Sequence, residues 1–183
     1  MRNLTFANQL TLLRIILIPA FVLLVVYGQL GAALTVFIVA GVTDALDGLI
    51  ARLAGQGTSL GAWLDPMADK LLLVSTFIVL SIPSLRLANT LPIWLTVCII
   101  SRDVVIVLTV IIVNLAVGRR TFRPSIFGKI ATALYMLTAV TAMFFNYRRH
   151  HSPAVDVLVY SSFAITIISS LDYIWRTRRV MEQ

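Results

Sequence analysis

Long apolar runs separated by short polar stretches make up most of this chain. The first run, residues 15–43, contains no charged residue and is too long for one membrane-spanning helix, which needs about 20 mostly apolar residues. The Tyr27-Gly28-Gln29 stretch divides it into two. Further charge-free runs follow at 71–85, 87–101, 104–118, 130–147 and 157–171. The pattern predicts an all-α polytopic membrane protein.

We expect six transmembrane helices, with a short amphipathic helix before the first. The expected bounds are 8–27, 31–53, 61–83, 91–117, 126–146 and 154–175. Four prolines fall in or beside the proposed loops, where helix breakers belong: Pro83, Pro92, Pro124 and Pro153. Pro19 lies inside the first helix, and a membrane helix tolerates the resulting kink. Because no linker or repeat marks a boundary, residues 1–183 are expected to form a single domain.

Composition agrees with a membrane protein and narrows its partners. Only 13% of the residues are charged, whereas soluble domains average about a quarter. The net charge is +7, but the basic residues gather at the ends of apolar runs. This favours anionic headgroups or an anionic substrate over nucleic acid. The balance of Lys and Arg in the loops predicts that both termini face the cytoplasm, and we expect a bacterial inner membrane.

Four aspartates interrupt the apolar pattern at Asp44, Asp47, Asp65 and Asp69. A charge at the bilayer centre costs roughly 3 kcal/mol on insertion scales, so each needs a physical reason. The first two are three positions apart and the last two are four positions apart, so each pair shares one helical face. A short loop joins the two helices and makes them antiparallel. The four carboxylates should therefore converge near the cytoplasmic boundary.

Four carboxylates at one place require protonation or bound cations. Ligation by carboxylates alone suits Mg²⁺, Mn²⁺ or Ca²⁺ better than zinc. Two such ions would clamp a phosphate during an in-line displacement. Gly48, Ala51 and Gly61 lie near the aspartates and leave room for a ligand or for close helix packing. Arg52, at the helix end, is suited to neutralise a diphosphate.

Together these residues follow a spaced pattern: Asp44-x2-Asp47-Gly48-x2-Ala51-Arg52-x8-Gly61-x3-Asp65-x3-Asp69. The pattern resembles the signature of the CDP-alcohol phosphatidyltransferase family, with all eight positions matched. The resemblance implies transfer of a phosphatidyl group from CDP-diacylglycerol to an alcohol, with release of CMP and an active site on the cytoplasmic side.

The resemblance also implies roles for these residues. Asp44, Asp47 and Asp65 would bind a two-metal centre of Mg²⁺ or Mn²⁺, with Asp69 contributing. Asp69 would also be the general base toward the acceptor hydroxyl. The CDP pocket would be formed by Gly48, Ala51, Arg52 and Gly61.

The start of the first helix also resembles many members of the family. Its segment Asn8-Gln9-Leu10-Thr11-x2-Arg14 places Thr11 and Arg14 one turn apart, where both would face the diphosphate. The alternative is that the Arg14 side chain reaches out to the membrane interface.

Basic residues of the fourth and fifth helices are candidates for binding the acceptor. Arg102 belongs to an Arg102-Asp103 pair inside the fourth helix, which could equally be a self-contained ion pair. Arg119 and Arg120 lie in the next loop, and Lys129 lies further into the fifth helix. These features resemble the phosphatidylglycerophosphate synthase and cardiolipin synthase branches, and they favour an acceptor that carries its own phosphate.

The acceptor stays open between two alcohols at this point. Glycerol-3-phosphate is the first choice, and phosphatidylglycerol, giving cardiolipin, is the alternative. A hypothesis of another class is an ion-coupled transporter, since intramembrane carboxylates also mark ion pathways. The sequence shows one aspartate hairpin and no counterpart in its second half, unlike many transporters. Membrane lipids are expected partners, and a homodimer is compatible with the sequence.

Overall fold

A computed structural model describes residues 6–54, 61–117 and 125–181, with side chains described for 13–43, 70–109, 111–112, 115 and 125–176. In these ranges all regular secondary structure is helical. The helices are α1 (Phe6–Val26), α2 (Leu30–Ala54), α3 (Gly61–Leu80), the 3₁₀ turn η1 (Pro83–Leu85), α4 (Ile93–Val117), α5 (Ile126–Tyr147) and α6 (Pro153–Met181).

The predicted helices agree with this structure except at two ends. α3 ends at Leu80 instead of 83, because Pro83 lacks a backbone N–H and begins η1. α6 continues to Met181, beyond the predicted end at 175, because its arginines are good helix formers although they are not apolar. The expected amphipathic N-terminal helix falls mainly on residues 1–5, which lie outside the described residues.

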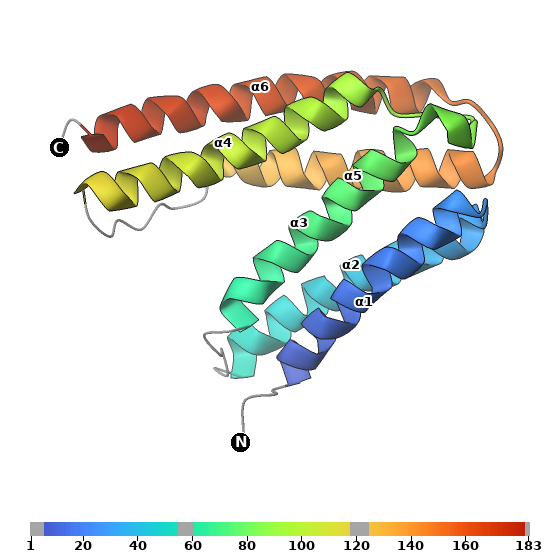
Figure 1. The fold of residues 1–183 in the computed structure, drawn as a ribbon, viewed down its shortest axis with the longest axis horizontal. Coiled ribbons are helices and arrows are strands. Elements are labelled where there is room, and N and C mark those ends of the chain that lie inside the picture. Colours follow the sequence, from blue (N-terminus) through green and yellow to red (C-terminus); the bar gives the residue numbers. More distant parts are fainter. Residues whose placement is uncertain (1–5, 55–60, 118–124, 182–183) are drawn as a thin grey trace.

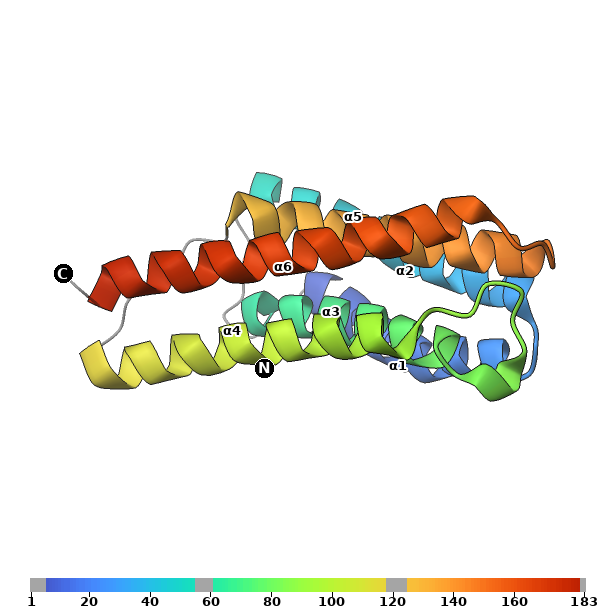
Figure 2. The same ribbon diagram turned by 90° about the horizontal axis from the view of Figure 1, so that it is seen from above.

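The six helices pack in two layers. Figure 2 shows α2, α5 and α6 in one layer and α1, α3 and α4 in the other. α1 packs against α2 and α3, while α6 packs against α4 and α5. The helices thus form two groups, α1–α3 and α4–α6. These two groups lie close together at the end that holds η1 and diverge toward the other end (Figure 1). The second half of α2 and the first half of α3 lie at this diverging end.

Rings and small polar groups fill the space between the helices. Phe21 of α1 packs against Phe37 of α2 at 5.9 Å between ring centroids. Hydroxyl groups pair across helices: Thr138 of α5 bonds Ser162 of α6 at 2.8 Å between their oxygens. Large apolar side chains instead lie exposed on the outside, among them Ile16, Leu23, Ile38, Ile78, Val107, Leu137, Ile167 and Trp175. Polar pairs inside and apolar groups outside are typical of helices packed in lipid.

Two described helices meet a length and hydropathy test for crossing a membrane. They are Ile126–Tyr147 and Pro153–Arg176. Shorter apolar helical stretches occur at Leu13–Val26, Leu30–Thr43 and Lys70–Leu80.

Candidate active site

The four aspartates lie on two consecutive antiparallel helices that contact each other. Asp44 and Asp47 belong to the second half of α2, and Asp65 and Asp69 belong to the first half of α3. The α2–α3 hairpin is at the diverging end of the helices (Figure 1). This confirms the predicted positions on the helices. The aspartate side chains lie outside the described part, as do the side chains of Thr11, Gly48, Ala51, Arg52 and Gly61.

Arg14 of α1 is buried, with 2% of its surface exposed. The expected alternative, a side chain that reaches out to the membrane interface, does not fit this burial. Arg14 on α1 and Thr43 on α2 are separated by about the same number of residues from the turn that joins the two helices. Arg14 is therefore level with the Asp44 end of the site. A buried guanidinium must be compensated, which suits a residue that faces an anionic centre.

A chain of polar contacts links α3 to α4 and α6 beside the aspartate hairpin. Lys70, the residue after Asp69, places its Nζ 3.1 Å from Oδ2 of Asp103 on α4. Arg102 Nη1 donates to Asp103 Oδ1 at 2.8 Å. Arg102 Nη2 donates to Oγ of Ser169 on α6 at 2.6 Å. One carboxylate therefore holds two cations that come from different helices.

Gly128 of α5 makes room for the Arg102 guanidinium. A Cβ atom at this position would lie 3.2 Å from Arg102 Nη2 and 4.0 Å from Ser169 Oγ. The glycine is inside a helix, where it is otherwise unfavourable. Its place in α5 is explained by this close approach. The contact connects α5 to the same group of residues.

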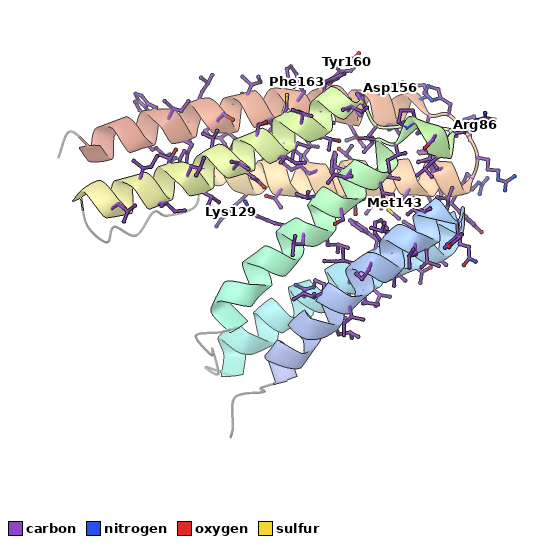
Figure 3. The ribbon with its side chains drawn as sticks, in the orientation of Figure 1. Arg86, Lys129, Met143, Asp156, Tyr160 and Phe163 are labelled. Atoms are coloured by element: carbon purple, nitrogen blue, oxygen red, sulfur yellow. The ribbon has the colours of Figure 1, made fainter. Side chains whose placement is uncertain are left out.

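Lys129, the next residue of α5, is exposed. Figure 3 shows it on the side of α5 toward α2 and α3. Among the described residues no carboxylate forms an ion pair with it. Lys129 is therefore an exposed cation with no counter-charge among the described residues. Arg119 and Arg120, the other predicted acceptor residues, lie outside the described residues.

Arg102 had two interpretations, an acceptor-binding residue or a self-contained ion pair with Asp103, and the structure bears on the second. The self-contained pair with Asp103 is present, and both terminal nitrogens of Arg102 have protein partners. Sequence reasoning missed Lys70 and Ser169. A lysine directly after Asp69 in an apolar helix was a signal for the first. Ser169 is far from Arg102 along the chain, and nothing in its local pattern marks it.

Carboxylates are the only metal-ligand type at the predicted centre, and this donor set fits a hard divalent ion. Where side chains are described, no group of three or more His, Cys, Asp or Glu residues gathers to form another metal site. The chemistry of the four aspartates on α2 and α3 therefore fits the metal that the sequence pattern implies.

Comparison with known proteins gives the family and its branches. Residues 4–169 match the CDP-alcohol phosphatidyltransferase family. A Mycobacterium tuberculosis protein named "Probable phosphatidylglycerophosphate synthase" is 34% identical over 179 residues, covering 94% of this chain and 81% of the relative. A Haemophilus influenzae CDP-diacylglycerol–glycerol-3-phosphate 3-phosphatidyltransferase is 33% identical over 169 residues, covering 90% and 89%.

A relative from the second branch is the CMP-forming cardiolipin synthase of Homo sapiens. It is 35% identical over 162 residues, which cover 78% of this chain and 52% of the relative. The match to the family spans all six helices up to Ser169, and it includes the aspartate hairpin and the Lys70–Asp103–Arg102 contacts. This chain belongs to the CDP-alcohol phosphatidyltransferase family, and it is a transferase of that family.

Proposed function

We propose that the chain is an integral membrane enzyme whose six helices cross the inner membrane of a bacterium. Support comes from the exposed apolar side chains on every helix and from the hydroxyl pairs between helices. A soluble monomer rarely exposes apolar surface of this extent. With the N-terminus inside, the aspartate end of the bundle faces the cytoplasm, where CDP-lipid and water-soluble acceptors meet.

In this proposal the enzyme transfers a phosphatidyl group from CDP-diacylglycerol to glycerol-3-phosphate. The observation that carries it is the eight-position pattern on two adjacent antiparallel helices. Relatives named for this reaction or its product match along 81% and 89% of their own length. The cardiolipin synthase relative matches along only 52% of its length. The larger share of the relative that is matched in the other branch favours glycerol-3-phosphate as the acceptor.

The chain's residues divide the work as follows. Asp44, Asp47 and Asp65 would hold Mg²⁺ or Mn²⁺, with Asp69 contributing; when bound, the metal would neutralise the charge of the diphosphate. Asp69 accepts the proton of the acceptor hydroxyl. The acceptor oxygen then forms a bond to the phosphorus on the lipid side. The bond from that phosphorus to the oxygen of CMP breaks, and CMP leaves.

Binding of the substrates is assigned to two groups of residues. The CDP headgroup would lie against the small residues Gly48, Ala51 and Gly61, with positive charge from Arg52 and Arg14. Thr11 is placed with Arg14 at this end of α1. Burial of Arg14 supports this, because a buried cation suits an anionic partner.

The acceptor's phosphate would meet Lys129, with Arg119 and Arg120 in the adjoining loop. Lys129 is favoured because it is exposed and forms no ion pair with the described carboxylates. Arg102 has a different place in the proposal. Its terminal nitrogens bond Asp103 and Ser169, so it acts on the acceptor by shaping the wall of the pocket or by exchanging one of these bonds.

Phosphatidylglycerol is the second candidate acceptor. The observation that favours it is the 35% identity to a cardiolipin synthase, as high as the identity to the relatives of the other branch. The two acceptors differ in where they approach. Glycerol-3-phosphate comes from water, whereas phosphatidylglycerol comes from the bilayer.

A panel of acceptors tests the proposal. Purified protein is incubated with CDP-diacylglycerol, Mg²⁺ or Mn²⁺, and glycerol-3-phosphate, phosphatidylglycerol, inositol phosphate or serine, and CMP release is measured. We expect release with glycerol-3-phosphate. Release with phosphatidylglycerol alone would establish the second candidate, and no release with any acceptor would contradict a transferase active toward these alcohols.

A further inference from the structure

A cavity of about 450 Å³ lies at the end of the helices opposite the aspartate hairpin. Three segments enclose it: the α1–α2 turn, the loop around η1, and the end of α5. This is the end where the two groups of helices come together (Figure 1). The proposed reaction uses no residue of this cavity.

Two arginines that line the cavity have an unusual backbone conformation. Arg86 has φ of 47° and Arg149 has φ of 51°, and no other non-glycine residue of the described chain has positive φ. The left-handed region is costly for a residue with a Cβ atom. Gly28, with φ of 74°, lines the same cavity and adopts this region without that cost.

Arg149 occupies the position after α5 where a helix end usually has glycine. Arg149 N–H donates to Asn146 O at 3.0 Å, and His150 N–H donates to Phe145 O at 3.0 Å. This is the hydrogen-bond pattern in which a helix usually ends with glycine. α1 ends with the same pattern, and there the left-handed residue is Gly28. An arginine where glycine fits better calls for a role of its side chain.

Both arginine side chains are free to bind an anion. Among the described residues, neither Arg86 nor Arg149 forms an ion pair or a side-chain hydrogen bond. The carboxylate of Asp156, at the start of α6, is instead 3.4 Å from Nε2 of His151. Figure 3 shows Arg86 at the extreme end of the molecule, clear of the helix core.

Apolar side chains and one hydrogen-bonded asparagine also line the cavity. Val26, Leu30 and Leu87 are among the apolar lining residues. Buried Asn146, another lining residue, accepts from Asn89 N–H at 2.6 Å and donates from Nδ2 to Asn89 O at 3.1 Å. These bonds join the segment after η1 to the end of α5.

We propose that this cavity binds the headgroup of an anionic phospholipid in the leaflet opposite the active site. The inference rests on the proposed membrane-spanning arrangement, which puts this end at the second membrane surface. Arg86 and Arg149 bind the lipid phosphate, and the apolar lining residues contact the first carbons of the acyl chains. Lipid is the occupant because a free anion would make no use of the apolar lining residues.

The test compares two neighbouring arginines. Arg148 lies next to Arg149 in sequence but lines a different cavity, with Phe144, Phe145 and His150. Purified protein in detergent is titrated with phosphatidylglycerol or phosphatidylcholine, and bound lipid is counted by native mass spectrometry. Loss of one basic contact at a membrane surface corresponds to about fivefold weaker binding, so we expect this for R149Q and for R86Q. R148Q should bind phosphatidylglycerol like the parent.

Two further variants separate lipid binding from folding. R149G relieves the strained φ, so it should melt at a higher temperature than the parent while losing the same affinity as R149Q. R149K keeps the charge and should bind phosphatidylglycerol better than R149Q does. A lower melting temperature for R149G would contradict the idea that this position favours glycine for stability and carries arginine because of its charge.

Three results would overturn the proposal. They are equal retention of phosphatidylglycerol and phosphatidylcholine by the parent, equal losses in R149Q and R148Q, and displacement of phosphatidylglycerol by inorganic phosphate at the same concentration. CMP release with glycerol-3-phosphate is measured on the same samples and should not differ between R149Q and R148Q. Because lipid counting does not depend on turnover, an inactive protein that still shows the difference would contradict the proposed function and leave this inference standing.

Discussion

The ammonium group of Lys70 lies 3.1 Å from the carboxylate of Asp103 and joins α3 to α4. Lys70 follows Asp69, the proposed base, so this ion pair lies one residue from the base on the helix that carries two of the four aspartates. Asp103 also accepts from Arg102 at 2.8 Å, and Arg102 continues to Ser169 on α6. One carboxylate therefore links the aspartate hairpin to α4 and α6, in addition to the packing of α2 and α3 against α5.

The two cations on Asp103 should respond differently to mutation. The side chain of Arg102 is 9% exposed, whereas that of Lys70 is 50% exposed. Asp103→Asn leaves the buried guanidinium without its counter-charge and should cost about 3 kcal/mol. Lys70→Gln removes a half-exposed pair and should cost less than about 1 kcal/mol. Unfolding in detergent measures both, and equal losses would contradict the different burial of the two cations.

Two glycines of the helices offer a matched test of the packing around Arg102. A Cβ at Gly41 of α2 would meet only Met136 Cε at 3.7 Å, so Gly41→Ala should stabilise the protein by up to about 1 kcal/mol through helix propensity. At Gly128 a Cβ would lie 3.2 Å from an Arg102 nitrogen that is held by Ser169. Gly128→Ala should therefore destabilise, by about 1 kcal/mol or more. A gain at both positions would show that Arg102 moves aside freely.

Lys129→Ala should weaken acceptor binding selectively. A lost hydrogen bond to a charged group is worth about 1.5–3 kcal/mol, so the KM for glycerol-3-phosphate should rise about tenfold or more. The KM for CDP-diacylglycerol should change little. Lys129→Arg is the control that keeps the charge. Steady-state CMP release with each substrate varied in turn measures the effect, and an equal rise in both KM values would remove Lys129 from the acceptor pocket.

The sequence predicted the helices well because their signals are local. Charge-free runs and the prolines at their ends mark where each helix lies, and all six helix starts in the structure lie within two residues of those expected from the sequence. The predicted end of α6 was wrong because the apolar run ends before Arg176, whereas the helix continues to Met181.

Contacts between distant helices were beyond sequence reasoning. The pattern identified Arg102 and Asp103 as a charged pair, but Lys70 and Ser169 join it only because α3, α4 and α6 pack together. Gly128 likewise has a reason only when Arg102 is seen beside it. The aspartate pattern could be recognised from sequence because its members lie on two consecutive helices, where spacing alone determines the face.

The most direct test of the central claim follows labelled glycerol-3-phosphate into lipid. Purified protein is supplied with CDP-diacylglycerol and divalent metal, and both CMP and label in the lipid phase are measured. We expect one CMP to be released for each labelled phosphatidylglycerophosphate. For Asp69→Asn we expect a loss of at least about 100-fold in both, with CDP-diacylglycerol binding retained. CMP release without label in lipid, or normal turnover by Asp69→Asn, would contradict these expectations.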